Sequence, residues 1–429
     1  MKGKGLMVFF VALIWAFALS SPSNAQLNDM ELLGKLLYFD KNLSEPDGQA
    51  CASCHWPGTG FAEKNKGFPV SEGVIHGMFG GRNAPSAAYL AAVPKLHYDS
   101  AEGVWIGGAF WDGRATGYEL GHPLADQALG PFLADVEMHN GYYDGQEVWV
   151  PMPEWVVRDA ASSDYAYLFW EAFDGGDPVT YENIAGAIGY YERSKELNKF
   201  NSRFDDFWRA CKAAGIDDLT TITDPKDRRL PKGILGKQEI EGLILFHLPN
   251  DNDGILEKGE GGNCAVCHTM AEAKDPYNDE VTCPPLFTDF TYDNLGIPTN
   301  WQVYDLAGGS PPDLGLGGFL CNEDGPGPGL MAAAGLEPGT CISENGKFKV
   351  PTLRNVLHSA PYGHNGYFRT LQEIVHFYNT RDVPGEGWPT PEYDEGTVNR
   401  DELGKLGLSR QQENAIVSFM KTLTDRGKK

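Results

Sequence analysis

Long apolar runs are almost absent from this chain of 429 residues. Outside one stretch near the N-terminus, no segment approaches the roughly 18 apolar residues that a membrane-spanning helix needs. This excludes a protein built from several membrane-spanning helices, and we expect no membrane partner. Hydrophobic residues still make up 41% of the chain and aromatic residues 12%, which is enough to form cores and excludes a wholly disordered chain.

Basic residues are also scarce. The chain has 35 Lys and Arg against 59 Asp and Glu, which gives a formal net charge of −24. A chain this acidic repels phosphate backbones and anionic lipid surfaces, so nucleic acid is excluded as an expected partner. A basic protein, such as a small redox protein, is favoured by the same charge.

The one apolar stretch has the features of an export signal. Lys2 and Lys4 precede an apolar run from Leu6 to Leu19, and Ser23-Asn24-Ala25 offers small residues for cleavage. We therefore predict a signal peptide over residues 1–25 and a periplasmic mature protein. The alternative is an uncleaved anchor, although the run is short for spanning a bilayer.

Four of the eight cysteines lie in two similar sequence segments. They are the CxxCH motifs Cys51-Ala52-Ser53-Cys54-His55 and Cys264-Ala265-Val266-Cys267-His268. In such a motif the thiols add to the vinyl groups of haem and the histidine binds the iron; zinc binding and thioredoxin-like redox chemistry are the alternatives. No second Cys/His pair lies near either motif to complete a zinc site. The chain is thus predicted to carry two covalent c-type haems, with His55 and His268 as proximal iron ligands.

Four cysteines remain outside the motifs. Cys321 and Cys341 bracket a Gly/Pro-rich loop, where a disulfide would suit an oxidising compartment. Cys211 and Cys283 could pair or stay free, and the sequence leaves both alternatives open.

The chain is rich in loop-forming residues, with 52 Gly and 28 Pro. Helices are predicted over 31–39, within 181–209, over 237–247, and from Ser409, where Gln412 would complete a capping box. A polar link over 220–232 separates two halves that each contain a helix, a CxxCH motif and long loops. The predicted fold class is mainly α, with two cytochrome c-like haem domains (26–222 and 233–429) and long Gly/Pro-rich loops.

Several further segments occur in an order that points to a known family. They are Leu33-Gly34-Lys35-Leu36-Leu37-Tyr38-Phe39-Asp40, Gly81-Arg82-Asn83-Ala84-Pro85, Phe110-Trp111-Asp112-Gly113-Arg114 and Pro351-Thr352-Leu353-Arg354-Asn355. Together with the first CxxCH motif, they make the chain resemble the bacterial di-haem cytochrome c peroxidases and their MauG-type relatives. The resemblance covers nearly the whole chain after the signal. It implies an N-terminal haem that reacts with peroxide, a C-terminal haem that passes electrons in, and a calcium ion between the domains.

The resemblance assigns three residues to catalysis. Gln127 and Glu137 match the pair that lines the family's peroxide pocket, and Trp111 resembles the tryptophan between the two haems. Cleavage of the O–O bond needs a group that moves a proton from one peroxide oxygen to the other, a role that a buried carboxylate with a raised pKa can fill. We assign that role to Glu137 and the orientation of peroxide to Gln127. The segment between Trp111 and Gln127 is longer than the family's spacing, so we expect the pocket rim to differ.

The resemblance also implies metal ligands. Asn83, Ser359 and Pro361 match the family's calcium ligands, an Asn side chain and two backbone carbonyls, with Ser in place of the usual Thr. His76 lies near the loop histidine that caps the N-terminal iron in peroxidases that need reductive activation, but farther from His55 than usual. Tyr378 stands where peroxidases place Met and MauG-type enzymes place Tyr as the ligand of the second haem. His376 or a Met are the alternatives for that ligand.

Three functions follow from these expectations. The first is a periplasmic peroxidase that reduces hydrogen peroxide with electrons from a small cytochrome c or cupredoxin. The second is a MauG-like enzyme that uses peroxide to oxidise residues of a protein substrate, and Tyr378 favours it. The third is a di-haem electron carrier without catalysis, which Gln127 and Glu137 disfavour. The resemblance is also compatible with a homodimer.

Overall fold

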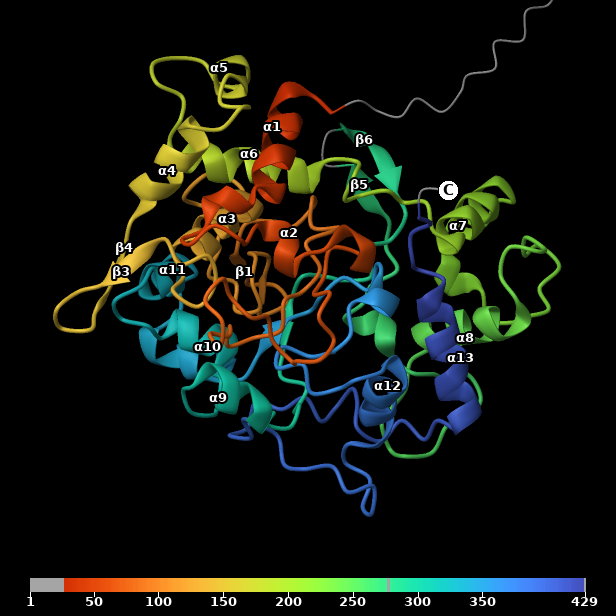
Figure 1. The fold of residues 1–429 in the computed structure, drawn as a ribbon. Helices are drawn as coiled ribbons and strands as arrows, with labels where there is room; N and C mark the ends of the chain where they lie inside the picture. The colour runs from red at the N-terminus through yellow and green to blue at the C-terminus, as the bar shows by residue number, and fades with distance from the viewer. Residues whose placement is uncertain (1–26, 276–277, 428–429) are drawn as a thin grey trace, which may run out of the picture.

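The computed structural model describes residues 27–275 and 278–427, and the predicted signal peptide over residues 1–25 lies outside them. Within these ranges the fold is mainly α, as expected, with thirteen α-helices and four two-stranded antiparallel sheets joined by long loops (Figure 1). No helix in the described part of the chain is both long and apolar enough to cross a membrane.

The helices are α1 (Asp29–Phe39), α2 (Cys51–Cys54), α3 (Pro123–Leu133), α4 (Pro153–Ala161), α5 (Leu168–Ala172), α6 (Tyr181–Arg193), α7 (Arg203–Ala213), α8 (Lys237–His247), α9 (Trp301–Ala307), α10 (Gly315–Leu320), α11 (Gly327–Ala333), α12 (Leu371–Thr380) and α13 (Arg410–Lys421). The strand pairs are β1 (His97–Asp99) with β2 (Val104–Ile106), β3 (Gly141–Tyr143) with β4 (Trp149–Pro151), β5 (Ala273–Asp275) with β6 (Asn278–Cys283), and β7 (Tyr292–Asp293) with β8 (Phe348–Lys349).

The first hydrophobic core is built on α1, α3 and α6 (Figure 1). Helix α1 begins with a capping box formed by Asn28 and Glu31, which satisfies backbone amides that the first turn leaves free. It crosses α6 at Gly34, where a Cβ atom would lie 1.9 Å from the carbonyl oxygen of Ala187. The glycine therefore allows the two helix backbones to touch.

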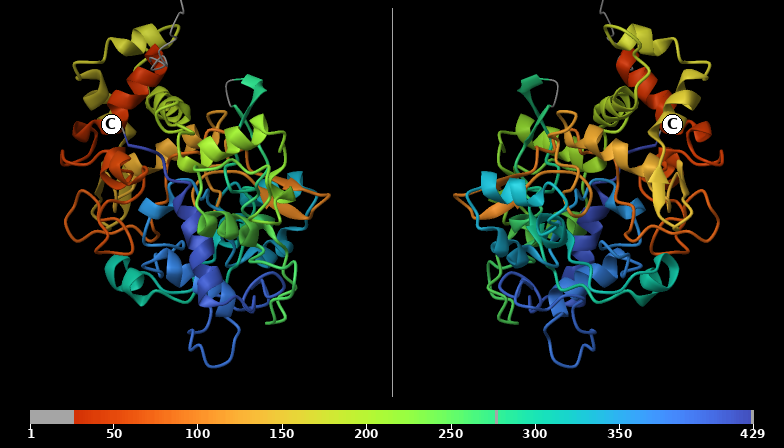
Figure 2. Two further views of the ribbon diagram at one scale, coloured as in Figure 1. Left: turned by 90° about the vertical axis from the view of Figure 1, so that its right-hand side faces the viewer. Right: turned by 90° about the vertical axis from the view of Figure 1, so that its left-hand side faces the viewer.

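The second core repeats this arrangement with α8 and α13, which lie side by side (Figures 1 and 2). At Gly242 of α8, a Cβ atom would lie 1.9 Å from the carbonyl oxygen of Ala415 in α13. The rings of Phe246 and Phe419 meet at 5.2 Å and pack with other aromatic rings in this core. Each half of the chain thus places a close helix crossing beside its CxxCH motif.

The predicted helices at 31–39 and 237–247 are confirmed as α1 and α8, and Ser409 and Gln412 form the predicted capping box of α13. The helical signals within 181–209 belong to two helices, α6 and the first part of α7. Ser202 begins α7 by accepting from the amide of Asp205, which starts a new helix.

The two cores divide the chain near residue 200. Most buried apolar residues up to Leu197 pack in the first core, and a few, such as Val70 and Trp105, belong to two smaller clusters. Phe204, Phe207 and Cys211 of α7 pack in the second core. The segment from Ile222 to Leu230 covers the second core as well. The domain ranges expected from the sequence, 26–222 and 233–429, remain predictions.

A disulfide joins Cys321 and Cys341, the two cysteines that bracket the Gly/Pro-rich loop. It ties the end of α10 to the 3-10 helix Pro338–Glu344, within a small third core that also contains Trp105 and Tyr292.

Candidate haem and peroxide site

Both CxxCH motifs open into one cavity of about 450 Å³. Its wall includes Cys54 and His55 from the first motif and Cys264 and His268 from the second. A smaller cavity of about 120 Å³ borders Cys264, Cys267 and His268 without reaching the first motif. The larger cavity has the size of a cofactor site. The chain brings the haem-attachment residues of both halves to this interior space.

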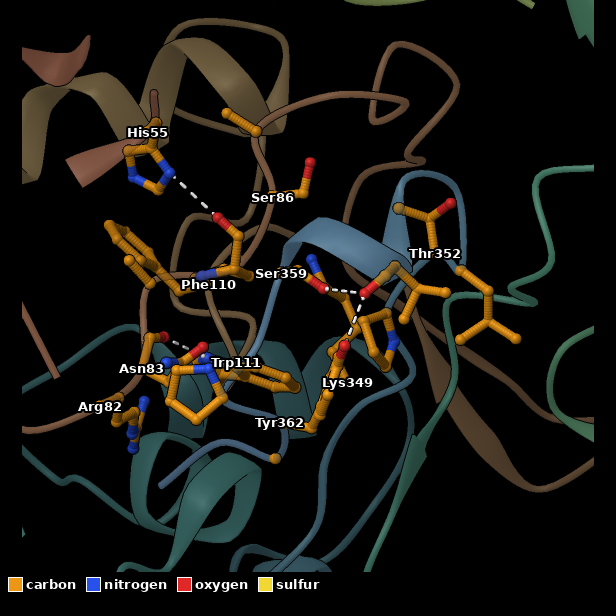
Figure 3. A pocket seen from close by; sticks show the side chains of 18 of the residues that line it. His55, Arg82, Asn83, Ser86, Phe110, Trp111, Lys349, Thr352, Ser359 and Tyr362 are labelled. Carbon is orange, nitrogen blue, oxygen red and sulfur yellow. Dashed lines mark hydrogen bonds between the residues drawn. The ribbon is translucent and has the colours of Figure 1, made fainter. Parts of the chain in front are cut away.

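The imidazoles of the two motifs are held as an iron ligand requires. His55 Nδ1 lies 3.0 Å from the carbonyl oxygen of Pro85, and His268 Nδ1 lies 2.9 Å from that of Phe287 (Figure 3 shows the first contact). A carbonyl can only accept, so each Nδ1 donates and each Nε2 is left to bind metal. Burial lowers the pKa of His268 to about 4 and also lowers the pKa of His55, which favours the neutral, metal-binding form of each ring. These residues fit two c-type haems.

Gln127 and Glu137 border the same cavity as His55. Gln127 lies on α3, and Glu137 follows it in a turn in which its carbonyl oxygen accepts from the amide of Val74 at 2.8 Å. Desolvation raises the pKa of Glu137 above its ordinary range, and the positive charge of Arg114 opposes this shift. The structure therefore brings together an amide, a carboxyl group with a raised pKa and a haem-binding histidine.

The long segment before α3 is attached to this helix by hydrogen bonds. The carboxylate of Asp126 accepts from the backbone amides of Leu120, at 2.7 Å, and Glu119, at 3.3 Å. Asp126 is the neighbour of Gln127 on α3, so this segment is attached beside the candidate peroxide pocket.

Trp111 borders both cavities. Its indole Nε1 donates to the carbonyl oxygen of Asn83 at 2.8 Å (Figure 3), and its own carbonyl oxygen accepts from the amide of Lys349 at 2.9 Å. The ring is thereby fixed next to the residues of both haem sites.

The three residues matched to calcium ligands also line the larger cavity: Asn83, Ser359 and Pro361. The amide nitrogen of Asn83 donates to the carbonyl oxygen of Pro69 at 2.9 Å, so its side-chain oxygen is the atom that could bind a cation. A calcium site here remains a prediction.

His76 is not part of the cavity wall among the described residues. Its side chain is 99% exposed, and its Nδ1 lies 2.7 Å from a carboxylate oxygen of Glu72, which does border the cavity. In this conformation His76 is therefore a surface residue that does not line the cavity of His55.

Tyr378 lies on α12 and borders both cavities together with His268. Desolvation, and then the nearby Cys267 and Cys264, raise the pKa of its phenol well above the usual range. The alternative His376 is turned toward other partners, since its Nδ1 lies 2.8 Å from Glu413. Met420 also borders the larger cavity, so Tyr378 and Met420 are the candidates that the structure places near the second motif.

Two residues of the cavity wall were missed in the sequence. Glu192 of α6 is buried, and its Oε2 has no hydrogen-bond partner among the described residues; burial raises its pKa to about 8. Lys349 of β8 is also buried. In the sequence each has the character of a surface charge. The one signal for Lys349 is its position two residues before the segment Pro351-Thr352-Leu353-Arg354-Asn355.

Comparisons with known proteins identify the family of this chain. The sequence profile of the family described as di-haem cytochrome c peroxidase matches residues 28–213. The methylamine utilization protein MauG of Paracoccus denitrificans is 30% identical over 414 residues, covering 92% of this chain and 88% of that protein. The cytochrome c551 peroxidase of Nitrosomonas europaea is 26% identical over 407 residues, covering 94% and 81%.

Solved structures give the same result. The diheme peroxidase BthA of Burkholderia thailandensis superposes with a TM-score of 0.67 at 28% identity, over 92% of this chain and 86% of that chain. The similarity to MauG extends over most of both chains, and membership of such a family implies two c-type haems. The chain is therefore an oxidoreductase that belongs to the di-haem cytochrome c peroxidase family.

Proposed function

We propose that this protein is a periplasmic di-haem peroxidase that reduces hydrogen peroxide to water with electrons from a small cytochrome c or cupredoxin. The observation that carries this proposal is the position of Glu137 and Gln127 in the cavity that also holds His55. An electron carrier without catalysis would need no buried acid at its haem, so this observation disfavours that alternative.

The haem bound at His55 would supply the electrons that break the O–O bond. The chain supplies the proton transfer: Glu137, as a carboxylate, removes a proton from one oxygen of hydrogen peroxide and delivers it to the other, which leaves as water. Gln127 orients the peroxide by hydrogen bonding. Because its pKa is raised above the ordinary value, the carboxyl group of Glu137 is better suited to accept a proton and then donate it.

We further propose two haem units that meet at Trp111. The first unit contains the core of α1, α3 and α6, and the second contains the core of α8 and α13, into which electrons enter. Trp111 borders both cavities, so it is the side chain best placed to pass an electron between them. A calcium ion at Asn83, Ser359 and Pro361 would hold the two units in register.

The periplasmic location is proposed from two features. The first is the export signal expected over residues 1–25, and the second is the disulfide between Cys321 and Cys341, because disulfides persist in oxidising compartments.

The test is the replacement Glu137→Gln, measured by stopped-flow consumption of peroxide with reduced cytochrome c. Loss of general acid–base catalysis should slow the peroxide step by about 10²-fold or more, with both haem spectra unchanged. Glu171→Gln, at an exposed position of α5, is the matched control and should react like the native protein. Native peroxide kinetics in Glu137→Gln would remove Glu137 from the mechanism.

A MauG-like oxidation of a protein substrate is the second candidate function. Tyr378 favours it, because this phenol borders the cavities of the second haem. An oxygen ligand stabilises ferric iron and so lowers the potential of the second haem, which makes that haem a poor electron store for peroxide reduction.

A further inference from the structure

Lys349 is a buried cation without a carboxylate partner. Its residue is 7% exposed, and its Nζ donates to the carbonyl oxygen of Gly108 at 3.0 Å. No ion pair joins it to any carboxylate of the described residues, although Asp112 acts on it from a distance. Burial of an ammonium group without an anion is costly, so a negative partner is expected.

The other cationic side chains of the cavity wall are already paired. Arg82 donates to Asp313 at 2.7 and 2.8 Å, and Arg114 donates to Asp112 at 2.8 Å. The fully buried Arg354 donates to Asp205 at 2.7 Å. Among the described lysines and arginines of this wall, Lys349 alone lacks a carboxylate.

The position of Lys349 indicates where its partner must come from. The residue borders both cavities, and the smaller one contains Cys267, His268 and Tyr378 but no residue of the first motif. A c-type haem brings two propionates, which are carboxylates, into the space that its cysteines and histidine define. The second haem would therefore carry a carboxylate, which is the kind of anion that the Nζ of Lys349 lacks.

We propose that the Nζ of Lys349 is the counter-ion of a propionate of the second haem. The inference rests on the placement of haem at the second CxxCH motif. It also links this haem to Trp111, because the backbone amide of Lys349 donates to the carbonyl oxygen of Trp111 at 2.9 Å. The residue acts as a positioning residue: it fixes the propionate and the charge beside the tryptophan that lies between the two sites.

The test is Lys349→Met in the di-haem protein, with the potential of each haem measured by redox titration followed by EPR. Removal of the cation leaves the propionate uncompensated and favours ferric iron. We expect the ferrous-to-ferric ratio of the second haem to fall by about tenfold at a given potential, a shift of about 59 mV for one electron. Lys349→Arg should keep the native potential.

Lys347→Met is the matched control. Lys347 lies two positions away and pairs with Glu344 at 3.0 Å, so its loss removes the same charge without touching the cavity. An unchanged second-haem potential in Lys349→Met, with both haems attached, would overturn the proposal, and so would a shift of the first haem alone. Covalent haem content should remain two per chain.

A measurement on the native protein covers the case in which Lys349→Met does not fold. Infrared difference spectra with ¹³C-labelled haem propionates should show an ionised carboxylate on the second haem at neutral pH. A protonated propionate there would overturn the assignment. Neither measurement depends on peroxide turnover, so failure of the peroxidase proposal would leave this result standing.

Discussion

Ionisable side chains are concentrated in the walls of the two cavities. Glu137, Glu192 and Tyr378 all have pKa values raised by desolvation, and Lys349 has its pKa lowered to about 8 by the same cause. Each is therefore closer to its neutral form than it would be at the surface. Clusters of ionisable groups with shifted pKa values are typical of functional sites. Burying such groups costs free energy, which other parts of the fold must offset.

Tyr378 is the residue that best separates the two candidate functions. If its phenolate binds the second haem iron, Tyr378→Met should raise the potential of that haem, because a thioether stabilises ferrous iron. Tyr378→Phe should change the visible spectrum of the second haem alone. Redox titration and optical spectra provide the measurement, with Tyr190→Phe at an exposed position of α6 as control. A native spectrum and potential in Tyr378→Phe would turn attention to Met420.

The raised pKa of Glu192 predicts that the stability of the protein depends on pH. Its pKa is raised from 4.5 to about 8 in the folded protein, so between these values the folded state holds a proton that the unfolded chain releases. The free energy of unfolding should therefore fall as pH rises through this window. Glu192→Gln removes that dependence, and its stability relative to the native protein should be higher at pH 8 than at pH 5.

Chemical denaturation at the two pH values measures the effect. Glu182→Gln, at an exposed position of the same helix, is the control and should show no such change with pH. Equal effects of Glu192→Gln at both pH values would show that Glu192 is ionised in the folded protein.

At the scale of elements, both cores depend on a glycine where two helices cross. Gly34→Ala would place a methyl group against the backbone of α6, and Gly242→Ala would do the same against α13. Because backbone cannot move as a side chain can, we expect each substitution to lower the free energy of unfolding by roughly 1–3 kcal/mol.

Gly186→Ala in α6 is the matched control. A Cβ atom added there would have no described atom within 4 Å apart from its chain neighbours and the backbone of its own helix. Alanine is favoured over glycine in a helix by about 1 kcal/mol, so this variant should be neutral or more stable. Thermal and chemical unfolding compare the three variants. Equal stability of Gly34→Ala and Gly186→Ala would contradict a close crossing of α1 and α6.

At the scale of the whole molecule, the charge of −24 should govern the encounter with an electron donor. Attraction between opposite charges speeds association, and salt screens it over about 10 Å at 0.1 M ionic strength. The second-order rate constant for a basic cytochrome c should therefore fall about tenfold or more between 20 and 200 mM salt. Stopped-flow mixing measures it, and the reaction with uncharged peroxide should change little. A salt-independent rate would place the docking site away from the acidic surface.

The halves of the molecule are joined by contacts between residues far apart in sequence. The carboxylate of Asp425 accepts from the hydroxyl of Tyr89 at 2.6 Å and from the amide nitrogen of Asn355 at 3.0 Å. Arg82 of the first half pairs with Asp313 of the second. Arg82 borders the larger cavity and Asp313 the smaller one, so the walls of this interior space depend on the packing of both halves.

The sequence by itself determined the chemistry and the local elements. The two CxxCH motifs, the mainly α class, the bounds of α8 and the capping box of α13 follow from neighbouring residues, because thioether attachment, helix periodicity and capping are local properties. The family was also predicted from motifs and their spacing. The same pattern made Cys321 and Cys341 candidates for a disulfide without deciding that they pair.

Only the tertiary structure decided which of these residues meet. It joined the two motifs in one cavity, placed α7 in the second core, turned His376 toward Glu413 and left His76 at the surface. It also buried Glu192 and Lys349, whose sequence neighbours give no sign of burial. Burial depends on segments that are distant in the chain, and desolvation by those segments, more than the residue type, sets the charge state of each group in the site.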